Sequence, residues 1–315
     1  MHTILNLFLL ILGLALLVQS AKVFVSSSVE IATKLRIPRL IIGLTIVAMG
    51  TSAPEVVISV SAAIGGSSDL AIANVVGSNL FNLMFIVGFC AMLSPIAVKM
   101  KAISRDYWVS FAATILLFVM VFIFSDSIPR FGGFILLVFF TVYMAAVVHH
   151  ARKNKTADTG QHDITAKPKP LWRSIIFAIL GIGIIIAAGQ LTVWSAVNIA
   201  TAIGISERVV GLTIVAMGTS LPEFVTTIIA CRKGEGEFAL GFIIGSSIFN
   251  ILFVLGLAGS IMPLAIGYGV LFDVAVLIGG TLAFFMFAKS SERLVRFEGF
   301  ALVAIFGAYM TWVLI

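Results

Sequence analysis

The sequence has little charge for its length. Only 11% of its 315 residues are Asp, Glu, Lys or Arg, and 60% are hydrophobic, whereas an ordinary soluble domain carries about 25% charged residues. This composition predicts an integral membrane protein. The net charge of +6 does not indicate a nucleic-acid partner, because the basic residues stand between apolar runs, where they mark topology.

Histidine and cysteine are also scarce. All four histidines fall outside the apolar runs, and the two cysteines, Cys90 and Cys231, have no metal-binding spacing. The apolar runs therefore contain no constellation typical of an enzyme, and we expect no cofactor and no protein partner. The first apolar run has no basic stretch ahead of it and no clear cleavage site, so it is interpreted as a membrane span rather than a signal peptide.

About 20 apolar residues are needed to cross a bilayer as a helix. By this measure the chain has ten spans and is an all-α polytopic membrane protein. The predicted spans are 4–32, 40–64, 70–93, 107–125, 131–148, 172–200, 208–231, 238–261, 268–288 and 297–315. The polar, proline-containing stretch 149–170 is the predicted linker between two five-span halves, 1–148 and 171–315.

The distribution of lysine and arginine predicts the orientation. If the linker is cytoplasmic and the loops alternate from it, 17 of the 20 Lys and Arg residues lie on the cytoplasmic side. We therefore expect a multi-pass protein of the inner (plasma) membrane with a cytoplasmic linker and both termini outside.

The two halves repeat each other. GLTIVAMGTSAPE at 43–55 returns as GLTIVAMGTSLPE at 211–223, identical in 12 of 13 positions. GSNLFN at 77–82 returns as GSSIFN at 245–250, so both motifs recur at one and the same offset along the chain. Because five spans per half is an odd number, the second copy must enter the membrane from the opposite side. The sequence thus predicts inverted repeats, which place the binding site near the midplane.

Each copy of the longer motif places a glutamate, Glu55 or Glu223, within an apolar segment. A charge at the centre of a span costs about 2.5–3.5 kcal/mol on insertion scales. Protonation or pairing with a basic residue would remove that cost. However, Lys22 is the one basic residue that lies away from the ends of a predicted span, and it cannot neutralise both acids. A bound cation best explains the two carboxylates.

The residues around each glutamate are oxygen donors at a helix break. In the first copy, Pro54 lacks an N–H and Gly50 adds backbone freedom, so we expect the helix to open near 48–52 and to free carbonyls such as that of Ala48. Thr51 and Ser52 add hydroxyls on the same side as the glutamate. The second copy supplies Ala216, Gly218, Thr219, Ser220 and Pro222 in the same order. Such hard oxygen ligands suit Ca²⁺ and Na⁺.

The shorter repeat brings a second set of polar groups. Ser78 and Asn82, like Ser246 and Asn250, are four residues apart and share a helix face. They are predicted to complete the ion site. Hydrogen bonding between helices is the alternative role for these four residues, and it is the role we assign to Asn74, Asn79 and Ser247.

The duplicated GTSxPE and GSxxFN motifs resemble the two alpha-repeats of the Na⁺/Ca²⁺ exchanger family, within the cation/Ca²⁺ antiporter group. The resemblance covers the whole chain and implies a prokaryotic-type exchanger without a regulatory domain, because the linker is short. It implies that Glu55 and Glu223 are the central Ca²⁺ ligands and that the Thr and Ser hydroxyls contribute Na⁺ or Ca²⁺ oxygens. It also implies that the carbonyls of Ala48 and Ala216 flank the Na⁺ positions.

The expected function is therefore antiport of Na⁺ and Ca²⁺ by alternating access. A Ca²⁺/H⁺ or other cation/H⁺ antiporter is the alternative on the same scaffold. The proton-coupled branch of the antiporter group has a motif similar to GNxxE at the place where this chain has GTSxPE. This difference favours Na⁺ as the coupling ion. A cation channel with a glutamate ring is a further alternative, which the internal two-fold repeat disfavours.

Overall fold

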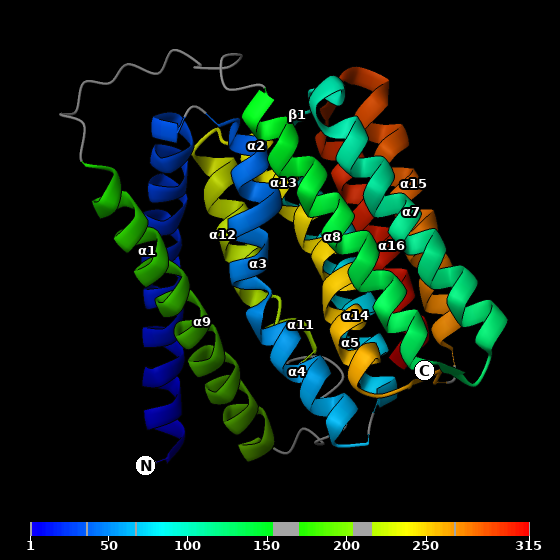
Figure 1. The fold of residues 1–315 in the computed structure, drawn as a ribbon. Helices are drawn as coiled ribbons and strands as arrows, with labels where there is room; N and C mark the ends of the chain where they lie inside the picture. Colours follow the sequence, from blue (N-terminus) through cyan, green and yellow to red (C-terminus); the bar gives the residue numbers. More distant parts are fainter. Residues whose placement is uncertain are drawn as a thin grey trace.

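The computed structural model describes residues 2–35, 37–66, 68–153, 170–203, 216–267 and 269–314. The described chain is a bundle of helices (Figure 1). The helices of the first half are α1 (His2–Leu35), α2 (Arg39–Ile42), η1 (Gly43–Val47), α3 (Ala48–Thr51), α4 (Ala53–Ile64), α5 (Ser68–Leu80), η2 (Phe81–Ile86), α6 (Val87–Leu93), α7 (Met100–Phe124) and α8 (Arg130–Lys153). Those of the second half are α9 (Leu171–Ala202), α11 (Ala216–Gly218), α12 (Leu221–Arg232), α13 (Gly236–Ile248), η4 (Phe249–Val254), α14 (Leu255–Ile261), α15 (Val270–Ser291) and α16 (Arg296–Leu314).

The chain is a multi-span membrane protein. Seven described helices are long and apolar enough to cross a bilayer, and the helix pair Arg39–Thr51 and Ala53–Ile64, bent by 48°, forms an eighth candidate. The predicted span 208–231 lies partly outside the described residues, and α16 forms a helix of 19 residues where the tenth span was predicted. The count of ten spans stays a prediction.

Four helices of the first half have counterparts in the second half with equivalent first and last residues. The number of residues between counterparts is the same as that between the two copies of each motif. This holds for α4 and α12, for α5 and α13, for η2 and η4, and for α6 and α14. Two short antiparallel ribbons, which sequence analysis missed, then join the halves. The first pairs β1 (Ile96–Ala97) with β4 (Arg293–Leu294), and the second pairs β2 (Ser127–Ile128) with β3 (Leu264–Ala265). Each ribbon contains one strand from each half.

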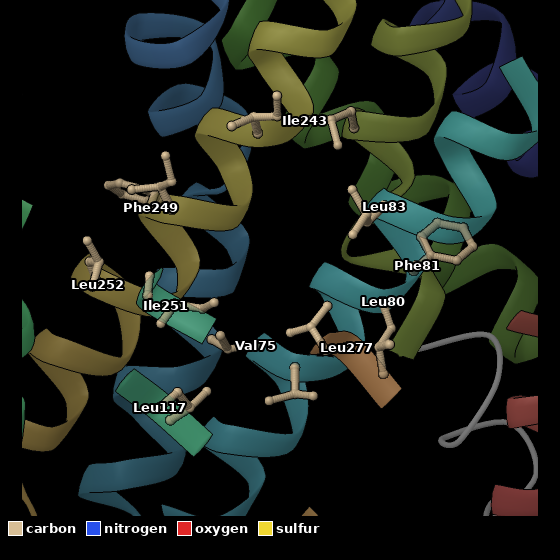
Figure 2. Packing of buried hydrophobic residues seen from close by; sticks show 14 of the residues in the cluster. Val75, Leu80, Phe81, Leu83, Leu117, Ile243, Phe249, Ile251, Leu252 and Leu277 are labelled. Carbon is tan, nitrogen blue, oxygen red and sulfur yellow. The ribbon is translucent and has the colours of Figure 1, made fainter. Parts of the chain in front are cut away.

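The main hydrophobic core lies between the central helices of the two halves. Figure 2 shows side chains of α5 and η2 facing those of α13 and η4, with Leu117 of α7 and Leu277 of α15 beside them. In an apolar 18-residue window of Gly236–Ile261, 94% of the residues are buried, and in one of Leu70–Leu93 78% are, whereas in the other long spans fewer than half are buried. These two segments are therefore the centre of the bundle, and they carry the second pair of motifs.

Helices α1 and α9 pack along each other at the edge of the bundle (Figure 1). A second hydrophobic cluster, which includes Phe24 of α1 and Ile185 of α9, joins this pair to η1, α12 and α13. In Figure 1 α1 begins and α16 ends toward the lower end of the molecule, whereas α8 ends and α9 begins toward the upper end. The two termini thus lie on the side opposite the predicted linker.

Backbone contacts hold η1 against α13. A Cβ built on Gly43 would lie 2.6 Å from the carbonyl oxygen of Phe238, and one on Gly245 would lie 2.5 Å from that of Leu44. Only glycine allows two helix backbones to approach this closely in a membrane bundle. The first glutamate motif is therefore fixed against the helix that carries the second copy of GSxxFN.

Two aspartates outside the repeated motifs, one buried and one half-buried, also bind across helices. Tyr143 of α8 donates a hydrogen bond to Asp106 of α7 at 3.3 Å, and Tyr309 of α16 donates one to Asp273 of α15 at 3.0 Å. The two pairs occupy corresponding places in the two outer helix hairpins, so each hairpin is closed by the same kind of contact. Sequence analysis gave neither tyrosine a role.

Candidate ion-binding site

Each glutamate lies in the first turn of a helix that starts at a break. Helix α3 ends at Thr51, Ser52 leaves helical geometry (φ −80°, ψ 12°), and α4 begins at Ala53. In the second half Ser220 (φ −90°, ψ 11°) stands at the same place before α12. The structure thus has the first break at Ser52, at the end of the predicted stretch 48–52. The role of the prolines differs from the expected one. Each proline occupies the start of a new helix, where a missing N–H costs nothing.

This location also stabilises the glutamates. Glu55 and Glu223 are acidic residues in the first turns of α4 and α12, and both are fully buried. The amino end of a helix carries a partial positive charge that favours an anion. The fold therefore compensates part of the cost of the two carboxylates through the backbone. Within the described residues, neither glutamate forms a salt bridge, and Lys22 is exposed on α1.

The two repeats exchange hydrogen bonds at their glutamates. Ser52 donates to Glu223 Oε1 at 3.2 Å, and Ser220 donates to Glu55 Oε1 at 3.3 Å. The serine before each helix thus binds the glutamate of the other repeat rather than its own. Both copies of the motif consequently meet at one place.

The second motif extends this network. The Ser52 hydroxyl lies 2.9 Å from that of Ser246, and Asn82 Nδ2 lies 3.4 Å from Ser246 Oγ. Because a hydroxyl has one proton and Ser52 donates its own to Glu223, Ser246 must donate to Ser52. Asn82, Ser246, Ser52 and Glu223 therefore form a directed chain of hydrogen bonds.

Among the described residues, five buried side-chain oxygens of the two pairs of motifs have no hydrogen-bond partner. They are Glu55 Oε2, Glu223 Oε2, Asn82 Oδ1, Asn250 Oδ1 and Ser78 Oγ. Buried polar atoms are nearly always paired, so a group of such oxygens needs an explanation. In the described part of the chain, no three His, Cys, Asp or Glu side chains cluster. Two carboxylates with amide and hydroxyl oxygens form a hard donor set, which suits Na⁺ or Ca²⁺.

The asparagines sit where the helices widen. Asn82 and Asn250 are the second residues of the π-helical turns η2 and η4, and such turns are frequent at functional sites. Asn79, which was assigned to helix contacts, donates to the Ser247 carbonyl at 3.2 Å and accepts from Asn250 Nδ2 at 3.2 Å. That assignment is confirmed, and the contact uses the amide nitrogen of Asn250, whose oxygen accepts no hydrogen bond among the described residues.

The remaining predicted site residues lie in or beside the short helices α3 and α11. The Ala48 carbonyl is not freed as predicted, because it accepts the Ser52 N–H at 3.1 Å. The hydroxyl of Thr51 donates to the Val47 carbonyl at 3.1 Å. In the second copy Ala216 and Gly218 form the short helix α11, and Thr219 is half-buried beside it. Thr226, which sequence analysis missed, has a buried hydroxyl without a partner one turn beyond Glu223.

A cavity of about 340 Å³ reaches both helix breaks. It is lined by side chains of α4 and α9 and by the residues just before Glu223, and these include Pro54, Val57, Gln190, Trp194, Thr219 and Pro222. Glycines allow α9 to contact the breaks closely: a Cβ on Gly218 would lie 2.3 Å from Val193. Helix α9 thus borders the ion site on one side.

The chain is similar to known proteins over nearly its whole length. The family model described as "Sodium/calcium exchanger protein" matches residues 5–149 and 173–315. A putative antiporter, CaxA, from Alkalimonas amylolytica is 39% identical over 96% of this chain and 97% of its own. The sodium/calcium exchanger MaX1 from Methanosarcina acetivorans is 32% identical over 97% of each chain.

Solved structures show the same fold. A structure of the sodium-calcium exchanger NCX_Mj superposes with a TM-score of 0.85, at 30% identity, over 98% of each chain. The family match spans nearly the whole chain, and it includes both copies of each motif. The chain therefore belongs to the sodium/calcium exchanger family.

Proposed function

We propose that this protein is a secondary active antiporter that exchanges Na⁺ for Ca²⁺ by alternating access. The observation that carries the proposal is the reciprocal binding of each glutamate by the serine of the other repeat, together with five buried oxygens of the same motifs that accept no hydrogen bond within the described part of the chain. The ions would bind at this place, with both repeats contributing ligands. The proposed ligands are Glu55, Glu223, Thr51, Thr219, Ser52, Ser220, Ser78, Ser246, Asn82, Asn250, Ala48 and Ala216. The Ala48 carbonyl, which accepts the Ser52 N–H, would bind through its second lone pair.

The charge of the site explains why the two ions would compete. Because Asn82 and Asn250 are neutral amides, the two ionised glutamates give the site a charge of about −2. One Ca²⁺ or two Na⁺ neutralise it. A buried pair of unneutralised carboxylates is costly, so closing the empty site is unfavourable. This is the physical reason for the coupling of the two fluxes.

The architecture proposed with this function has ten spans in two inverted repeats, 1–148 and 171–315, joined by a cytoplasmic linker. The common offset between corresponding elements, the pairing of each ribbon strand with a strand of the other half and the location of both termini on one side support it. Helices α1 and α9 would move against the central helices to open one side at a time. The lysine and arginine distribution places both termini outside.

Exchange is tested with proteoliposomes. Vesicles loaded with Na⁺ are diluted into Na⁺-free buffer with ⁴⁵Ca²⁺, and uptake is expected only with an outward Na⁺ gradient. Matched vesicles with choline inside and an imposed pH gradient form the control. Uptake driven by the pH gradient without Na⁺ would instead identify a Ca²⁺/H⁺ antiporter, and Ca²⁺ flux without any counter-ion would identify a channel.

The crossed serine contacts give a further prediction. Ser52→Ala and Ser220→Ala each remove a hydrogen bond to a buried carboxylate, and bonds to charged groups contribute about 1.5–3 kcal/mol. We expect each substitution to weaken apparent Ca²⁺ affinity by about tenfold or more in the uptake assay. Ser61→Ala, at an exposed position on α4, is the matched control. Equal affinities for S52A and S61A would contradict the assignment.

A further inference from the structure

The turn between α12 and α13 (residues 233–235) is tied to elements around it by charged side chains. Lys233 donates to the Lys22 carbonyl of α1 at 2.8 Å and also to the Ser26 hydroxyl. Glu235 binds Arg39, at the start of α2, with both oxygens at 2.7 and 2.6 Å, and its side chain is only 9% exposed. The α12–α13 turn is therefore fixed to both the peripheral helix α1 and the central helix α2.

The corresponding turn of the first half lacks the lysine. Gly66 and Gly234 are repeat equivalents, and both have positive φ, 84° and 75°. The two turns thus share a backbone bend that favours glycine. At the preceding position, however, the second half has Lys233 and the first half has Gly65. A side-chain contact from this position to the peripheral helix is therefore possible in the second half only.

The packing of the two peripheral helices differs in the same way. Helix α1 packs along α12, in the region of Lys22 and Ser26. Their equivalents on α9, Gln190 and Trp194, instead line the cavity of about 340 Å³ beside α4. Helix α1 is therefore packed on α12 where the exposed Lys233 binds it, whereas the equivalent residues of α9 border a cavity.

We propose that Lys233 is a positioning residue that holds α1 against α12 and keeps the ion site closed on the side of the α12–α13 turn. This inference rests on the alternating access proposed above. For the site to open toward this turn, α1 must leave α12, and the two contacts of Lys233 must break. The first half has no lysine at this position to oppose the equivalent movement of α9. The lysine thus makes the two access states unequal in free energy.

The test uses two repeat-equivalent reporter cysteines. Val57 lines the cavity, and Val225, its equivalent in the second half, is partly buried against the α1 cluster. Each is replaced by cysteine in a C90A/C231A background, and its reaction rate with a hydrophilic methanethiosulfonate reagent is measured in detergent without Na⁺ or Ca²⁺. We expect V57C to react faster than V225C. K233M, which keeps the aliphatic stem, should raise the V225C rate by about three- to tenfold and lower that of V57C.

Lys101, an exposed lysine of α7, supplies the control K101M, which should leave both rates unchanged. A V225C rate that K233M does not change overturns the proposal. If K233M does not give a monodisperse protein, Ser26→Ala replaces it, with a smaller increase expected and an unchanged rate again contradicting the proposal. The labelling needs no transported ion, so a chain that failed the Ca²⁺ uptake assay would still show or lack this shift.

Discussion

Replacing Glu223 by glutamine is expected to abolish Na⁺-driven Ca²⁺ uptake. The substitution keeps the size of the side chain and its ability to accept from Ser52, but it removes one of the two charges of the site. One Ca²⁺ would then face a site charge of about −1 and leave a net positive charge buried in the bundle. Such a charge is costly in a low-dielectric interior. We expect apparent Ca²⁺ affinity to fall by at least about 100-fold.

Glu55→Gln should have the same effect, because the repeats place the two acids equivalently and each is bound by the other half. Binding is measured by isothermal titration of purified protein, and flux by ⁴⁵Ca²⁺ uptake. Glu292→Gln, at an exposed position between α15 and α16, is the control for a change of surface charge. If E55Q or E223Q retains the flux of the E292Q protein, the two carboxylates are not the ion ligands.

The glutamates could be predicted from the sequence because they are charged, duplicated and placed in apolar runs. The helix break could be predicted because proline and glycine act locally on the backbone. The crossed pairing of Ser52 with Glu223 could not be predicted. Spacing along one helix shows which residues share a face, but it carries no information about which residue of another span lies opposite.

The ribbons, the π-helical turns and the state of the Ala48 carbonyl could not be predicted, because each is too local to produce a recognisable sequence pattern. The strands of the two ribbons are two residues long, too short for alternation of apolar and polar residues to appear. The π-helical turns at Asn82 and Asn250 depend on one extra residue per turn, which the surrounding apolar sequence does not record. The Ala48 carbonyl was expected to be free, but the N–H of Ser52 still reaches it, because the break occurs at Ser52 itself.

Gly245→Ala is expected to destabilise the protein and to weaken ion binding together. The new Cβ would meet the backbone of Leu44, with its oxygen at 2.5 Å and its Cα at 2.6 Å. Backbone cannot rotate away as a flexible side chain can, so α13 and η1 must separate. Overpacking of a core typically costs about 1–3 kcal/mol. We expect the thermal transition of the detergent-solubilised protein to fall by about 5 °C or more.

Gly279→Ala provides a control of opposite sign. Gly279 lies in the interior of α15, and a Cβ there has no neighbour within 4 Å among the described residues. Alanine favours a helix interior over glycine by about 1 kcal/mol, so this variant should unfold at the same temperature or higher. A G245A protein as stable as G279A would show that α13 and η1 do not pack as closely as the structure has them.

The effect of Gly245→Ala on binding follows from its neighbours. Ser246, the next residue, lies 2.9 Å from Ser52, and η1 leads directly into the break that carries Ser52. A separation of a few tenths of an ångström at Leu44 therefore lengthens the contact between the two serines and interrupts the chain of hydrogen bonds to Glu223. Protein that remains folded should bind Ca²⁺ more weakly than G279A. Binding equal to that of G279A would mean that the serine chain does not orient the carboxylate. The close approach of glycine to backbone thus connects the stability of the bundle to the geometry of its ion site.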